Sequence, residues 1–226
     1  MRIVWCRTDP WLAMPAVAEC FCEREGILTR DFFRAEDLVP HAAGRFLLRV
    51  GFRQYSPGRP FPPLRRVPGH GKPRFSGGQP FFSISHAGAV AVCAFSEREI
   101  GADVEQAAPV EPPLLSALQP EELAYLRQFP DSGQTEAFYR LWTQKESLIK
   151  ARGGALADIL EQESVITPGL LWKDRLDGFF LRRLPFPEPG YVLSVSAKEN
   201  SPAVIARLEL PRSIPRLLEE LRGDGA

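Results

Sequence analysis

Hydrophobic spacing divides the 226-residue chain into short segments of both secondary-structure types. Between residues 36 and 54, Phe46, Leu47 and Val50 recur at the spacing of one helical face, which predicts a helix. Short apolar runs between Gly and Pro residues predict strands. The expected strands are 3–6, 81–84, 89–95, 99–104, 178–183, 191–196 and 203–208. The expected helices are 11–24, 36–54, one that starts near residue 120, 135–151 and 214–221.

Two proline-rich tracts interrupt this pattern. Residues 57–80 contain seven Pro and five Gly, which predicts a loop. A loop of this length is commonly functional or flexible. Pro109, Pro112 and Pro113 mark the second break. Helices mixed with antiparallel-looking strands predict an α+β fold.

The composition narrows the class of protein. The chain is 44% hydrophobic and 25% charged, which excludes a disordered protein. The longest apolar run, 87–95, is too short to cross a bilayer, and the apolar run 3–6 is too short for a signal peptide. The four cysteines and three histidines lack zinc-ligand spacing, so we expect reduced thiols in a cytoplasmic protein.

Charge is unevenly distributed although the net charge is zero. Residues 38–96 contain no Asp or Glu and eight Lys or Arg, whereas residues 97–163 contain thirteen acids and six bases. This division suggests a site that holds both a polyanion and a divalent cation. Two solvated surfaces of opposite charge would explain it equally well.

Asp103 and Glu105 are two residues apart on an expected strand, so their side chains share a face. Paired carboxylates of this kind suit Mg²⁺, which commonly takes one or two protein carboxylates together with substrate phosphates. The alternative is an ordinary exposed pair.

Glu146 and Lys150 lie one turn apart on an expected helix, in line with Trp142. They are either a surface ion pair or a third metal carboxylate followed by a lysine that reaches a phosphate, and helical spacing alone does not separate these readings. His86 follows Ser83-Ile84-Ser85 where a strand turns into a loop, and is either structural or a phosphate donor.

Three segments together resemble one family. Phe82–His86, Ile100–Glu105 and Phe138–Lys150 are similar to the three ordered motifs of 4′-phosphopantetheinyl transferases, and Gly71-Lys72-Pro73 also fits. The resemblance is to the larger, monomeric type that activates peptide synthetases, and it covers residues 69–156. It implies two similar α+β halves related by a pseudo-twofold axis, with the active site between them. We therefore expect a division into residues 1–99, on the coenzyme A side, and 100–226, which carries the metal-binding motifs.

The resemblance also implies roles for individual residues. Asp103, Glu105 and Glu146 match the family's Mg²⁺ ligands, and His86 and Lys150 match its coenzyme A phosphate contacts. The nucleotide-lining positions correspond to Lys72, Pro73 and Ser85, and Glu122 corresponds to a further acidic position near the metal. Pro40 stands where a basic residue is usual, and the alternatives for that contact are Arg34, His41 and Arg45.

The resemblance predicts a Mg²⁺-dependent transfer of 4′-phosphopantetheine from coenzyme A to a serine of acyl or peptidyl carrier proteins. Glu146, Lys150, Asp103 and His86 are the expected catalytic residues, with Glu146 as the most direct candidate for the base that takes the serine proton. We expect a monomer with no nucleic-acid or membrane partner. Two alternatives remain: a metal-dependent nucleotide hydrolase that uses the same acids, and a non-catalytic module that binds coenzyme A or carrier proteins.

Overall fold

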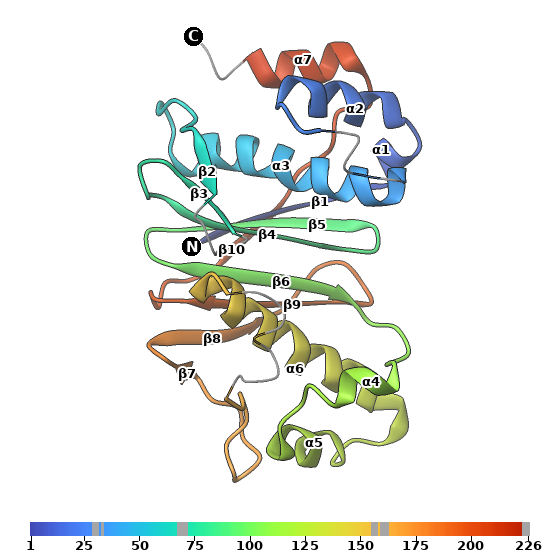
Figure 1. Ribbon diagram of the computed structural model, residues 1–226, viewed down its shortest axis with the longest axis vertical. Helices are drawn as coiled ribbons and strands as arrows, with labels where there is room; N and C mark the ends of the chain where they lie inside the picture. The colour runs from blue at the N-terminus through green and yellow to red at the C-terminus, as the bar shows by residue number, and fades with distance from the viewer. Residues whose placement is uncertain (29–31, 33, 67–71, 155–157, 159–162, 223–226) are drawn as a thin grey trace.

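The computed structural model describes residues 1–28, 32, 34–66, 72–154, 158 and 163–222. Two four-stranded sheets lie between layers of helices (Figure 1). The helices are α1 (Asp9–Leu12), α2 (Pro15–Arg24), α3 (Ala35–Tyr55), α4 (Pro112–Leu115), α5 (Pro120–Leu126), α6 (Asp131–Arg152) and α7 (Ile214–Arg222). The strands are β1 (Arg2–Arg7), β2 (Leu64–Arg66), β3 (Pro73–Phe75), β4 (Phe81–Ala87), β5 (Val90–Ser96), β6 (Ile100–Gln106), β7 (Arg175–Leu176), β8 (Phe179–Leu184), β9 (Tyr191–Ala197) and β10 (Val204–Arg207).

The first sheet has the strand order β10-β1-β5-β4. β1 is parallel to β10 and antiparallel to β5, although β10 comes from the last part of the chain. Val4 and Cys93 are cross-strand partners on one face and belong to a core cluster with Phe21 of α2, Phe46 of α3 and Leu217 of α7. These three helices therefore cover one face of the sheet, as Figure 1 shows.

The second sheet has the order β6-β9-β8-β7 and is antiparallel throughout. Ile100, Ala102 and Val104 of β6 are buried in one cluster with Trp5 and Val92 of the first sheet, so the two sheets pack against each other. Because side chains alternate along a strand, the intervening residues of β6 point to the opposite face, where α6 lies (Figure 1). This alternation is what brings the acidic residues of β6 to the helix that carries Glu146 and Lys150.

Most expected elements are confirmed, and the predicted α+β fold is confirmed. Two local predictions were wrong. The helix expected at 11–24 is divided into α1 and α2, since Pro15 lacks a backbone N–H and starts a new helix. The tract 57–80 is not entirely a loop, because β2 and β3 form a two-stranded antiparallel sheet within it.

The division into residues 1–99 and 100–226 stays a prediction. β10 and α7 belong to the second range and pack with the first sheet and its helices. Among the described helices, none combines the length and apolarity that crossing a bilayer requires.

Candidate active site

Asp103 of β6 meets Lys150 of α6 and Ser85 of β4 where the two sheets adjoin. The Lys150 Nζ donates to Asp103 Oδ1 at 2.6 Å and to Ser85 Oγ at 2.9 Å. The Ser85 hydroxyl donates to the same Asp103 oxygen at 2.7 Å. Lys150 therefore binds a residue 47 positions away rather than forming the local pair with Glu146 that helical spacing allowed.

The other carboxylate oxygen of Asp103 has no partner. Asp103 is buried, and its Oδ2 is one of three buried side-chain atoms without a hydrogen bond among the described residues. A buried acceptor left unsatisfied costs about 1–3 kcal/mol, more when it is charged. An oxygen in this state is a suitable ligand for a cation, so the site fits the metal that the motifs imply.

Two further carboxylates lie within electrostatic range of Asp103. Burial, and after it the negative charge of Asp103, raises the pKa of Glu105 to about 7 and that of Glu146 to about 7. Close carboxylates favour protonation because their charges repel, and a hard divalent cation relieves that repulsion. In their present positions, however, no three His, Cys, Asp or Glu side chains of the described chain meet as metal ligands. The positive charge next to Asp103 is the ammonium of Lys150, 2.6 Å from its Oδ1.

Gly101 allows β6 and α6 to approach closely enough for this site to form. A Cβ at Gly101 would lie 1.9 Å from the carbonyl oxygen of Ser147 and 2.4 Å from the backbone nitrogen of Ala151. Only glycine fits against the helix backbone at this distance. This role of Gly101 was not predicted, although a glycine inside a strand is itself a signal of close backbone approach.

A buried layer of hydroxyl and amide groups also joins α6 to the second sheet. Thr143 Oγ1 lies 2.8 Å from Ser194 Oγ, and Ser147 Oγ lies 2.8 Å from Ser196 Oγ. Gln144 donates to Ser147 and Ser196, at 3.1 Å each. These bonds fix the rotation of α6 on the sheet. The sequence offered one indication of this layer, because Ser194 and Ser196 are two residues apart on an expected strand and therefore share a face.

Glu122 does not join the acidic cluster as its family match suggested. Its Oε2 accepts bonds from Lys145 Nζ at 3.0 Å and Gln119 N at 2.9 Å, and its Oε1 accepts a bond from Val165 N at 3.0 Å. Both side chains of the Glu122–Lys145 pair are fully buried. Lys145 directly precedes Glu146, so this pair anchors the turn of α6 that carries the candidate ligand.

Lys72 contacts the backbone of β6 and α6 next to Lys150. Its Nζ donates to the backbone oxygens of Ile100 and of Lys150, the latter at 3.0 Å. Burial, then the positive charges of Arg74 and Lys150, lowers the pKa of Lys72 to about 7. Lys72 and Lys150 line one pocket of roughly 260 Å³ together with Pro73, Phe82, Ser83, Ile84 and Gly154. The nearby Gly71 and His70 lie outside the described residues.

His86 faces the opposite direction from Ser85, as alternation along β4 requires. It lines a hollow of roughly 600 Å³ with His41 and Pro40 of α3. Desolvation, then the charge of Lys150, lowers the pKa of His86. The structure thus brings His41, one of the three alternatives at the missing basic position, to the same hollow as His86.

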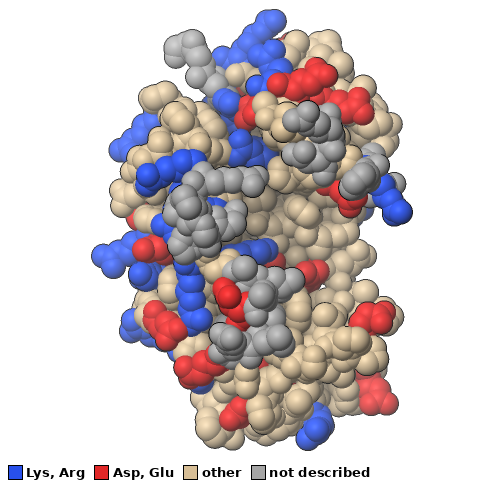
Figure 2. Space-filling model, in the orientation of Figure 1, with Lys and Arg blue, Asp and Glu red and all other residues tan. Residues whose placement is uncertain are grey.

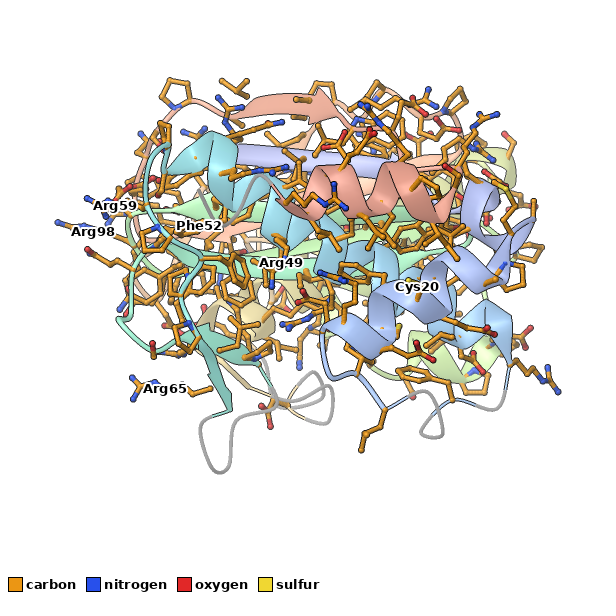
Figure 3. The ribbon with its side chains drawn as sticks, turned by 90° about the horizontal axis from the view of Figure 1, so that it is seen from above. Cys20, Arg49, Phe52, Arg59, Arg65 and Arg98 are labelled. Atoms are coloured by element: carbon orange, nitrogen blue, oxygen red, sulfur yellow. The ribbon has the colours of Figure 1, made fainter. Side chains whose placement is uncertain are left out.

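The basic stretch 38–96 is not a single surface. On α3, Arg49 lies 2.7 Å and Arg45 3.8 Å from the carboxylate of Glu25, so one negative charge offsets one of these two positive charges within the fold. Arg59 and Arg65 of this stretch instead lie on the left side of the view in Figure 3, as does Arg98, which follows the stretch, whereas Cys20 of α2 lies to the right of them. Figure 2 shows Lys and Arg side chains along the left edge of the visible face.

Comparison with known proteins agrees with the motifs. Residues 99–176 match a family model described as the 4′-phosphopantetheinyl transferase superfamily. Similar proteins include the 4′-phosphopantetheinyl transferase HetI of Nostoc sp., which is 32% identical over 145 residues, 61% of this chain and 61% of that protein. AcpT of Salmonella typhi is 35% identical over 105 residues, 44% of this chain and 55% of AcpT. Sfp of Bacillus subtilis is 36% identical over 85 residues, 37% of this chain and 38% of Sfp.

The matches cover less than two thirds of each of these relatives, at most 61%. Each relative is named as a 4′-phosphopantetheinyl transferase. The resemblance predicted from the three motifs is therefore confirmed, and the matched family segment includes Asp103, Glu105, Glu146 and Lys150.

Proposed function

We propose that this protein transfers 4′-phosphopantetheine from coenzyme A to a serine of an acyl or peptidyl carrier protein. The observation that carries the proposal is the contact between Asp103 and Lys150, with an unpartnered carboxylate oxygen, inside the segment that matches the transferase family. Ser85, which precedes this segment, donates to the same Asp103 carboxylate. We further propose that it acts as a cytoplasmic monomer whose site lies between halves 1–99 and 100–226. The cysteines of the structure are free thiols, as such a location requires.

Asp103, Glu105 and Glu146 would hold Mg²⁺ in this proposal. When bound, the ion supplies Lewis-acid stabilisation of negative charge on the diphosphate of coenzyme A. Burial, and after it the charge of Asp103, raises the pKa values of Glu105 and Glu146. Carboxylate oxygens are the donors that a hard cation prefers. Asp103 contributes the buried oxygen that has no other partner.

The chain's cations bind the rest of coenzyme A. Lys72 and Lys150 line one pocket with Pro73 and, in this proposal, contact the diphosphate and nucleotide. His86 and His41 share the hollow of roughly 600 Å³, which Asp37 also lines, and are proposed to hold the 3′-phosphate, with His41 taking the role of the basic residue replaced by Pro40. Histidine donates to phosphate through a ring N–H and most strongly when protonated.

In the transfer, the serine oxygen bonds to the phosphorus that carries the pantetheine arm, and the bond from that phosphorus to the bridging oxygen breaks. Adenosine 3′,5′-bisphosphate leaves. Glu146 takes the serine proton, directly or through water. Lys150 stabilises the charge that develops on the leaving diphosphate oxygen.

Intact-mass measurement of a purified apo carrier protein tests the proposal. After incubation with the enzyme, coenzyme A and Mg²⁺, the carrier should gain the mass of one 4′-phosphopantetheine. The Asp103→Asn variant should give no gain while it remains folded. An unchanged carrier would contradict the transferase proposal.

The same assay without carrier separates the two alternatives. Steady release of adenosine 3′,5′-bisphosphate from coenzyme A alone would indicate a hydrolase. Binding of coenzyme A without release or transfer under any condition would indicate a non-catalytic module.

A further inference from the structure

Lys150 and Asp103 differ in their freedom to move. The Lys150 side chain is 30% exposed and that of Asp103 only 4% exposed. Asp103 is also fixed by its bond from Ser85. Of the two partners, only the lysine can leave the contact without opening the core.

The ammonium of Lys150 already neutralises the charge that a metal ion would use. Its Nζ lies 2.6 Å from Asp103 Oδ1, while Oδ2 of the same carboxylate has no partner. Whichever oxygen a divalent cation takes, it approaches a carboxylate whose charge is balanced by a cation at contact distance. Repulsion between the two cations is strong in a buried site, where screening by water is weak.

Lys150 also has a second place to bind. It lines the pocket of roughly 260 Å³ that it shares with Lys72. The Nζ of Lys72 lies 3.0 Å from the backbone oxygen of Lys150, so two lysine side chains meet at this pocket. A diphosphate in this pocket would attract Lys150 away from Asp103.

We propose that Lys150 exchanges between two anionic partners: Asp103 in the free protein, and a diphosphate ligand when coenzyme A is bound. The inference rests on the proposed function and adds a regulation of its site. Lys150 suppresses metal binding until the diphosphate removes it from Asp103. Metal and coenzyme A then bind cooperatively, and by linkage each raises the affinity for the other by the same factor.

Binding of Mn²⁺, followed by its electron paramagnetic resonance signal, measures this without catalysis. The full-length protein is titrated with Mn²⁺ alone, and again with coenzyme A present and no carrier protein. In the unmodified protein, coenzyme A should strengthen Mn²⁺ binding within the range of about 5–150-fold that is usual for coupled ligands.

Lys150→Met should bind Mn²⁺ alone roughly tenfold more tightly than the unmodified protein, and coenzyme A should strengthen that binding much less. Lys150→Gln serves as a second variant that keeps a polar group. Arg152→Met is the matched control, because it removes one positive charge from the same last turn of α6 but pairs with Asp177 instead of Asp103. Thermal unfolding confirms that each variant is folded.

Equal or weaker Mn²⁺ binding by both Lys150 variants would overturn the exchange, as would an equal gain in Arg152→Met. The Asp103→Asn variant separates this outcome from failure of the proposed function. If Asp103→Asn no longer binds Mn²⁺ while the Lys150 variants bind it no more tightly than the unmodified protein, the metal assignment is supported and the proposed exchange of Lys150 is wrong. If Asp103→Asn binds Mn²⁺ as tightly as the unmodified protein, the metal assignment is wrong, and the proposed exchange of Lys150 is wrong as well.

Discussion

Lys145 and Glu122 form an ion pair with no exposed side-chain surface, in which the Lys145 Nζ lies 3.0 Å from Glu122 Oε2. The carboxylate also accepts the backbone N–H groups of Gln119 and Val165, so all of its bonds are made inside the protein. One side chain thus joins the start of α5, the middle of α6 and the segment at residue 165.

Lys145→Met should lower the free energy of unfolding by about 3–5 kcal/mol, because it leaves Glu122 buried without a counter-charge. Urea denaturation measures the loss. Arg140→Met on the same helix breaks an exposed pair with Glu136 and should cost less than about 1 kcal/mol. Similar losses in the two variants would mean that the buried pair contributes no more to the free energy of unfolding than the exposed pair does.

Glu146→Gln and Lys150→Ala should each reduce the transfer rate strongly, and the double variant should be little slower than the slower single one. Residues that serve one assembled transition state are non-additive in this way. The rates of all four proteins, measured with saturating Mg²⁺, provide the check. Independent effects that multiply in the double variant would show that the two residues do not act together.

Gly101→Ala should separate α6 from β6, since the added methyl group meets backbone atoms that cannot rotate away. Overpacking typically costs about 1–3 kcal/mol, and a rigid neighbour places this change at the upper end. Thermal unfolding and Mn²⁺ affinity should both fall. Gly77→Ala is the control, because a Cβ there meets nothing within 4 Å. A Gly101→Ala protein with unmodified stability would contradict the close approach.

His86→Ala should raise the Kd for coenzyme A more than it lowers the rate of the bound complex, as expected for a ground-state phosphate contact. His41→Ala should have a similar effect, because both rings line one hollow. Isothermal titration with coenzyme A and with dephospho-coenzyme A provides the measurement. If both ligands lose affinity equally, the 3′-phosphate is not the partner of these histidines.

Folding stability should rise with pH above neutrality because of Lys72. Its pKa is lowered to about 7 in the folded protein but is about 10.4 in an unfolded chain. Between these values the unfolded chain holds a proton that the folded protein has released, so the free energy of unfolding increases with pH. Urea denaturation from pH about 7 to about 10 should show this rise relative to Lys72→Met. Parallel pH profiles for the two proteins would exclude it.

The sequence predicted the elements whose pattern is local. The periodicities of β6 and α6 were sufficient to place Asp103 and Glu105 on one face and Glu146 and Lys150 on another. The partner of Lys150 could not be predicted, because Asp103 lies 47 residues away and the choice between Asp103 and Glu146 depends on tertiary packing. The burial of Lys145 could not be predicted either, since a lysine on a helix is normally exposed.

The parallel pairing of β1 with β10 has a consequence for biosynthesis. Arg2 is paired with Val204, so the first sheet lacks an edge strand until the segment 204–207 has left the ribosome. Contacts of such long sequence separation close slowly, because the intervening loop must lose its entropy first. Ser85 lies on the opposite edge strand of this sheet, in contact with Asp103. The first sheet therefore reaches its four-stranded form only after β10 has been translated, whereas the Ser85–Asp103 contact at its opposite edge does not include that strand.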